Sequence, residues 1–189
     1  MGGAANGANA CSACHGDQGE GRPEAGFPRL AGLNPDYIVQ QLNDLASGAR
    51  ANETMTPIAK ALSPAERTAL GAYLAGLQPP AAPVEPKPEE KVVAEGKKIA
   101  LQGLWDKDLP QCVSCHGAGG VGVGVNFPKL AGQSAQYIAN QLDAWKTGKR
   151  TNDPLHLMTG VASKLDDSQI AAVAAYFESL SPVAAGGAQ

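Results

Sequence analysis

The sequence predicts an all-α protein made of two tandem domains that are copies of one another. Three observations support this fold class. The chain repeats itself over most of its length, a proline-rich segment separates the two copies, and each copy has apolar stripes at helical spacing without an alternating strand pattern. We therefore predict a first domain over residues 1–78, a linker over 79–90 and a second domain over 91–189.

The internal repeat consists of sequence blocks that recur in the same order. Small insertions fall between the blocks, as expected for a duplicated domain whose loops have diverged. The blocks are CSACHG at Cys11 and CVSCHG at Cys112, FPRLAG at Phe27 and FPKLAG at Phe127, and MTPIAKAL at Met55 and MTGVASKL at Met158. Between them, Tyr37, Ile38, Gln41, Leu42, Gly48, Arg50 and Asn52 recur as Tyr137, Ile138, Gln141, Leu142, Gly148, Arg150 and Asn152.

The segment between the copies runs from Gln78 to Pro88 and reads QPPAAPVEPKP, with five prolines in eleven residues. Proline removes a backbone donor and fixes φ, so this segment cannot continue a helix or a central strand. We expect an extended, polyproline-like spacer, and we place the domain boundary there.

Each copy predicts two principal helices. In the first copy one helix begins at the cap Asn34, carries Pro35 in its first turn and ends at Gly48. A second helix begins with the capping box from Ser63 to Glu66. In the second copy the corresponding helices are expected to start at Ser134, to stop at Gly148 and to start again at about Asp166.

The inward faces of these helices follow from their apolar spacing. A further helix is expected around residues 90–101, before the second CVSCH, whereas residues 1–10 show no apolar stripe and predict no equivalent helix. The residues expected to face inward are Tyr37, Ile38, Leu42, Leu45, Leu70, Tyr73, Leu74 and Leu77, and then Tyr137, Ile138, Leu142, Trp145, Ile170, Val173, Phe177 and Leu180.

Composition limits the possible functions. The net charge of −3 gives no reason to expect nucleic acid or an anionic membrane as a partner. No run of roughly 18 apolar residues occurs, so no membrane span is predicted. Large side chains are few, with three Phe, four Tyr and two Trp, so two small domains would struggle to build a core alone. A large apolar prosthetic group in each domain would complete it.

C-x-x-C-H is the attachment signature of c-type haem, and it occurs once in each copy. Two cysteines three positions apart lie on one side of a helical turn, where they can form thioethers with one porphyrin, and the following histidine can ligate its iron. A thioredoxin-like site, a zinc site and structural disulfides explain the paired motifs less well. The predicted attachment residues are Cys11, Cys14, Cys112 and Cys115, and the predicted proximal ligands are His15 and His116.

The sixth iron ligands are predicted to be Met55 and Met158, because these two methionines occupy matched positions in the two repeats. We expect both to lie in loops before the last helix of their domain. His/Met ligation raises the redox potential and fills both axial positions, which favours electron transfer over substrate chemistry at the iron. We therefore predict a carrier rather than an enzyme. His156, two residues before Met158, is an alternative ligand, although a surface position is favoured because the first copy has no equivalent.

On these motifs the sequence resembles the cytochrome c4 family, periplasmic dihaem proteins built from two class I cytochrome c domains. The resemblance covers nearly the whole chain. It implies two covalently bound haem c groups that face each other, with propionates near the domain interface. It also implies that Pro28 and Pro128 accept hydrogen bonds from the proximal histidines. Asn52 and Asn152 are either polar neighbours of the methionine sulfurs or loop caps.

The resemblance implies export to the periplasm, although Met1 to Ala4 lacks the basic and apolar regions of a secretory signal. The leading functional hypothesis is a shuttle that takes electrons from a quinol-oxidising complex or a dehydrogenase to a terminal oxidase through transient contacts. The alternative is a cytochrome subunit bound permanently to a dehydrogenase. A dihaem peroxidase is a third hypothesis, disfavoured by the paired methionines.

Overall fold

The structure, a computed structural model, describes residues 11–78 and 87–182. Within these ranges the chain is helical, and its only β features are isolated bridges such as that between Arg22 and Phe27. The prediction of an all-α fold is therefore confirmed. Residues 1–10 and most of the expected proline-rich spacer, residues 79–86, lie outside the described residues, so the linker stays a prediction.

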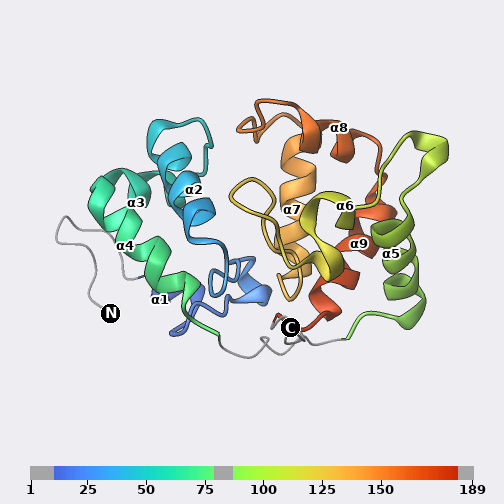
Figure 1. Cartoon of the computed structure of the whole chain (residues 1–189), viewed down its shortest axis with the longest axis horizontal. Coiled ribbons are helices and arrows are strands. Elements are labelled where there is room, and N and C mark those ends of the chain that lie inside the picture. The colour runs from blue at the N-terminus through green and yellow to red at the C-terminus, as the bar shows by residue number, and fades with distance from the viewer. Residues whose placement is uncertain (1–10, 79–86, 183–189) are drawn as a thin grey trace.

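The helices form two side-by-side domains (Figure 1). The first domain contains α1 (Ser12–His15), the short 3-10 helix η1 (Pro23–Ala25), α2 (Pro35–Ser47), α3 (Met55–Ala61) and α4 (Pro64–Ala75). The second contains α5 (Glu90–Gln102), η2 (Trp105–Lys107), α6 (Val113–His116), η3 (Ala118–Gly120), α7 (Ala135–Lys146), α8 (Leu157–Ser163) and α9 (Asp167–Ser179).

The caps of α2 and α7 act largely as expected. Asn34 Oδ1 accepts hydrogen bonds from the backbone of α2's first turn, and Gly48 ends the helix in the left-handed region at φ 89°. Ser134 Oγ caps α7 in the same way. Helix α7 stops at Lys146, and Gly148 follows it in the left-handed region at φ 72°, as expected of a glycine that ends a helix.

The last helix of each domain begins with a capping box. Ser63 and Glu66 exchange side chain and backbone hydrogen bonds at the start of α4, as the sequence predicted. Asp166 and Gln169 do the same at the start of α9. Both helices therefore begin where local sequence signals place them.

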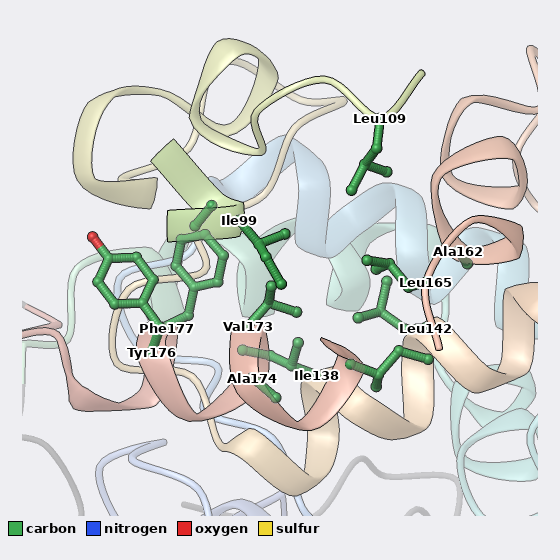
Figure 2. Packing of buried hydrophobic residues seen from close by; sticks show 12 residues of the cluster. Ile99, Leu109, Ile138, Leu142, Ala162, Leu165, Val173, Ala174, Tyr176 and Phe177 are labelled. Atoms are coloured by element: carbon green, nitrogen blue, oxygen red, sulfur yellow. The ribbon is translucent and has the colours of Figure 1, made fainter. Parts of the chain in front are cut away.

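The larger apolar core lies in the second domain, where Ile99 of α5, Ile138 of α7 and Phe177 of α9 meet (Figure 2). Helix α5 packs along α9, and Gly96 allows this because a Cβ there would collide with the backbone of Ala172. Tyr176 is buried in this contact. The first domain has a smaller core, formed by Leu33, Ile38, Leu42, Leu45, Ala59, Leu62 and Leu74.

One inward residue was predicted wrongly. Tyr73 of α4 is 44% exposed, whereas its counterpart Tyr176 is 6% exposed. The difference arises because Tyr176 lies against α5, and no equivalent of α5 occurs among the described residues of the first domain. In the part of the chain that the structure describes, no helix is long and apolar enough to cross a membrane.

Candidate functional site

Each C-x-x-C-H segment forms a single helical turn. The amide of His15 donates to the carbonyl of Cys11 at 2.9 Å, and the amide of His116 donates to that of Cys112 at 3.0 Å. None of the four cysteines forms a disulfide, so all are available for thioether bonds, and they are half-buried except for the exposed Cys115. Burial raises the pKa of the Cys112 thiol to about 11.

A folded-back loop brings a proline carbonyl to each histidine. In the first domain Gly21 N donates to His15 O at 2.8 Å, which turns the chain so that Pro28 reaches the imidazole. Gly21 has φ 88°, and a Cβ there would lie 2.7 Å from Arg29 N. Only glycine fits this close approach. Gly122, with φ 89°, makes the corresponding turn after His116.

His15 is held as a neutral imidazole with one defined tautomer. Its Nδ1 lies 2.9 Å from the carbonyl oxygen of Pro28, which can only accept, so Nδ1 carries the proton. Burial lowers the pKa of His15, while the bond to Pro28 opposes that shift. Among the described residues Nε2 is buried and has no hydrogen-bond partner. A buried nitrogen lone pair without a partner fits an iron ligand.

His116 repeats the Nδ1 hydrogen bond and the direction of the pKa shift. Its Nδ1 lies 2.7 Å from the carbonyl oxygen of Pro128, and burial lowers its pKa. A phenylalanine ring meets each imidazole edge-on, Phe27 at His15 and Phe127 at His116, with ring centroids 6.1 Å apart in both pairs. The hydrogen bonds that the resemblance implied for Pro28 and Pro128 are thus present.

Met55 and Met158 lie in short helices rather than in the expected loops. Met55 is the first residue of α3 and Met158 the second of α8, and both are half-buried against the core of their domain. Side chain caps create these helices. Asn52 Oδ1 accepts from Met55 N at 2.8 Å, and the Asp153 carboxylate accepts from Leu157 N and Thr159 N at 3.1 and 2.8 Å.

The neighbours of the methionines differ between the domains. Asn52 is a helix cap, one of the two roles considered for it. Asn152 instead donates into the first domain, to Gln41 Oε1 at 3.1 Å and to Asp44 Oδ2 at 2.7 Å. His156 is exposed and has φ 54°, with its carbonyl accepting from Gly160 N.

A reciprocal polar network joins the two domains where α2 and α7 face each other (Figure 1). Arg50 donates to Gln41 in its own domain at 3.0 Å and to Gln141 across the interface at 2.8 Å. Arg150 donates to Gln141 in its own domain at 2.8 Å and to Gln41 across the interface at 3.0 Å. Arg50 also donates to the hydroxyl of Tyr137 at 2.9 Å.

This network contains two cations and few anions. Arg150 is 6% exposed, and burial together with the nearby Arg50 lowers the pKa of its guanidinium. In the described ranges no carboxylate forms an ion pair with either arginine. The Arg150 guanidinium lies 4.0 Å from the ring centroid of Trp145, whose buried Nε1 has no partner among the described residues. The Trp145 N–H, unpartnered and next to this cation, fits a carboxylate of a haem.

The repeat comparison identified the matched Gln and Arg positions but assigned them no role, and it placed Tyr37 and Tyr137 only on apolar helix faces. Identity in both copies was the available signal. Asp153 and Gln133 were missed because neither is identical in the two copies: they correspond to Glu53 and Leu33.

Comparison with known proteins places these features in a family. The Cytochrome c family model matches residues 93–181, and the model for Cytochrome C oxidase, cbb3-type, subunit III matches residues 1–74. The "Thiosulfate dehydrogenase electron acceptor" of Thiomonas intermedia (strain K12) is 49% identical, over 96% of this chain and 84% of that protein. "Cytochrome c4" of Thiocapsa roseopersicina is 40% identical, over 90% of this chain and 87% of that protein.

A solved structure is also similar. Thiosulfate dehydrogenase (TsdBA) from Marichromatium purpuratum matches with a TM-score of 0.87 and 42% identity, over 97% of this chain. This chain spans 39% of the length of that protein.

The fold and the paired sites define a two-domain c-type cytochrome, an electron carrier with one covalent haem c in each domain. The chain belongs to the cytochrome c4 family.

Proposed function

We propose that the protein is a periplasmic carrier that takes single electrons from a thiosulfate dehydrogenase and passes them to a terminal oxidase or a similar acceptor. The assignment of two redox sites rests on two buried imidazoles, whose Nδ1 atoms donate to the carbonyl oxygens of Pro28 and Pro128. The choice of donor rests on the similarity to an electron acceptor of thiosulfate dehydrogenase.

In this proposal each domain supplies a complete ligand set. The cysteines would hold the porphyrin through thioethers, and histidine and methionine would ligate its iron. The first set is Cys11, Cys14, His15 and Met55, and the second is Cys112, Cys115, His116 and Met158.

The protein prepares these sites before any partner binds. Pro28 and Pro128 keep the imidazole proton on Nδ1, so Nε2 stays free to ligate. The apolar clusters around Met55 and Met158 limit the access of water. When bound, each haem supplies a one-electron change at its iron. With both axial positions filled, no position remains for a substrate, which favours a carrier over an enzyme.

Reduction by defined donors tests the proposed partner. The oxidised holoprotein is mixed with a thiosulfate dehydrogenase and thiosulfate, and haem reduction is followed by stopped-flow absorbance. We expect rapid reduction of both haems that slows as salt is added, because charged surfaces guide transient encounters. A quinol-oxidising complex serves as the comparison donor. Reduction by that complex alone would contradict the assigned donor.

Permanent association with the dehydrogenase is the second candidate. One observation favours it: 97% of this chain matches 39% of a larger thiosulfate dehydrogenase chain, so an equivalent of this protein occurs there within one polypeptide. Size-exclusion chromatography of the two purified proteins separates the candidates. A complex of fixed ratio that persists at high salt would indicate a subunit, and separate elution would indicate a shuttle.

A further inference from the structure

One peptide group connects the first haem site with the second domain. The carbonyl oxygen of Pro28 accepts the 2.9 Å hydrogen bond from His15 Nδ1. The N–H of the same peptide group belongs to Arg29, and it donates to Gln133 Oε1 at 2.9 Å. His15, the peptide group and Gln133 therefore form one continuous chain of hydrogen bonds across the domain boundary.

Gln133 is held firmly in this position. Its Oε1 also accepts from Ser134 N at 3.0 Å, and its Nε2 donates to the carbonyl of Arg29 at 2.9 Å. Gln133, Arg29 and Ser134 are exposed by only 6%, 4% and 5%. The amide thus binds both backbone groups of Arg29, and its orientation is fixed because reversing it would break these bonds.

The contact has no counterpart at the other site. The repeat places Leu33 where the second domain has Gln133, and Leu33 is packed in the apolar core of the first domain. His116 still donates to Pro128. Within the described residues, the next amide, Lys129 N, makes no hydrogen bond comparable to that of Arg29 N. The second domain therefore forms a hydrogen bond to the first site, and among the described residues the first domain forms no equivalent bond to the second site.

We propose that Gln133 is a positioning residue that tunes the first haem site from the second domain, acting on His15 through the Pro28–Arg29 peptide group. Hydrogen bonds in series polarise one another, so the bond to Gln133 makes the Pro28 carbonyl a stronger acceptor. A stronger acceptor at Nδ1 makes Nε2 a better donor to ferric iron and lowers the redox potential of that site. This inference rests on the proposed ligand role of His15.

The test compares the holoprotein with its Gln133→Leu variant, which introduces the residue found at the matching position of the first domain. NMR measures exchange of the Nδ1 proton of each proximal histidine in the reduced protein. We expect exchange at His15 to become faster, because the Pro28 carbonyl becomes a weaker acceptor for Nδ1 when Arg29 N loses its partner. Exchange at His116 should not change. In a redox titration, the potential of the first haem should rise and that of the second should stay the same.

Two further variants separate tuning from general loosening of the interface. Thr151→Val removes another interdomain hydrogen bond, from Thr151 Oγ1 to the carbonyl of Ala49, and should leave both histidines unchanged. Gln133→Glu retains the acceptor for Arg29 N but loses the donor to the Arg29 carbonyl, and it should keep exchange at His15 slower than in Gln133→Leu. Unchanged exchange at His15 in Gln133→Leu, or equal changes at both histidines, would overturn the proposal.

Failure of the underlying ligand assignment would be recognised separately. In the oxidised, unmutated protein the ring signals of His15 should show the large hyperfine shifts of an iron ligand. Their absence would overturn the ligand role of His15, and the tuning role with it, before any variant is compared. Normal shifts with no effect of Gln133→Leu would overturn the tuning role alone.

Discussion

Arg150 Nη2 donates a 3.0 Å hydrogen bond to Gln41 Oε1, joining side chains 109 positions apart in the chain. The same oxygen accepts from Arg50 and from Asn152. One glutamine oxygen of the first domain thus receives donors from both domains. It is a central acceptor of the interface, and its loss leaves several buried donors without their partner.

Replacing this acceptor should destabilise the protein. In Gln41→Leu two largely buried guanidiniums lose an acceptor, and we expect unfolding free energy to fall by about 3 kcal/mol, since each unsatisfied buried group costs about 1–3 kcal/mol. Urea denaturation of the holoprotein measures the loss. Gln136→Leu is the control, because Gln136 is exposed on α7 and, among the described residues, its side chain bonds to Asn140 of the same helix. A similar loss in both variants would contradict the role of Gln41.

Replacing each methionine should affect only one haem. In Met55→Ala or Met158→Ala one iron loses its thioether ligand, so we expect a lower potential for that haem and an unchanged potential for the other. Optical redox titration and the weak red absorption of ferric iron bound to methionine provide the measurement. His156→Ala tests the alternative ligand. If that variant, and not Met158→Ala, changes the second haem, the assignment of Met158 is wrong.

Trp145 Nε1 is a buried donor that no residue in the described part of the chain accepts from. We expect its Nε1 to donate to a carboxylate of the second haem, so Trp145→Phe should lower the potential of that haem, because the carboxylate charge is then less well compensated. The potential of the first haem should not change. Trp105→Phe is the matched control, since Trp105 is 69% exposed. Equal potentials in Trp145→Phe and the unmutated protein would contradict this role.

The capping box of α4 should make part of the stability depend on pH. Hydrogen bonds from Ser63 lower the pKa of Glu66 below its ordinary value of 4.5. The folded state therefore favours the ionised form, and this contribution is present above the ordinary pKa and lost as pH falls through the lowered one. Glu66→Gln should remove this dependence. Urea midpoints between pH 7 and pH 3 measure it.

A control for this prediction is Glu53→Gln, which changes an exposed glutamate outside any capping box. It should leave the pH dependence of the urea midpoint as it is in the unmutated protein. An equal effect of both substitutions would mean that overall charge, and not the box, sets the dependence.

Local signals made most of the fold predictable. Asn34, Ser63 and Asp166 mark helix starts because each cap depends on residues within one turn. The methionine segments were predicted as loops because their helices are short and depend on caps that precede them, Asn52 and Asp153. A cap alone does not distinguish a helix of seven residues from a loop.

The contacts between domains could not be predicted in this way. Tyr73 and Tyr176 have the same local pattern, and only the presence of α5 distinguishes them. Gln133 appears in the sequence as an ordinary departure from Leu33, and its partner Arg29 lies 104 positions away. The two C-x-x-C-H motifs were recognisable from sequence because covalent haem attachment imposes a fixed spacing, whereas a domain interface imposes none.

The reciprocal pairing of Gln41 with Arg150 and of Gln141 with Arg50 has a consequence for symmetry. The same two residue types, at matched positions of the repeat, contact each other in both directions. In oligomers, this self-complementary arrangement is the isologous interface of a two-fold dimer. A single domain of this type therefore carries a face suited to a second copy of itself, and the duplicated chain joins covalently what a symmetric homodimer holds by contact alone.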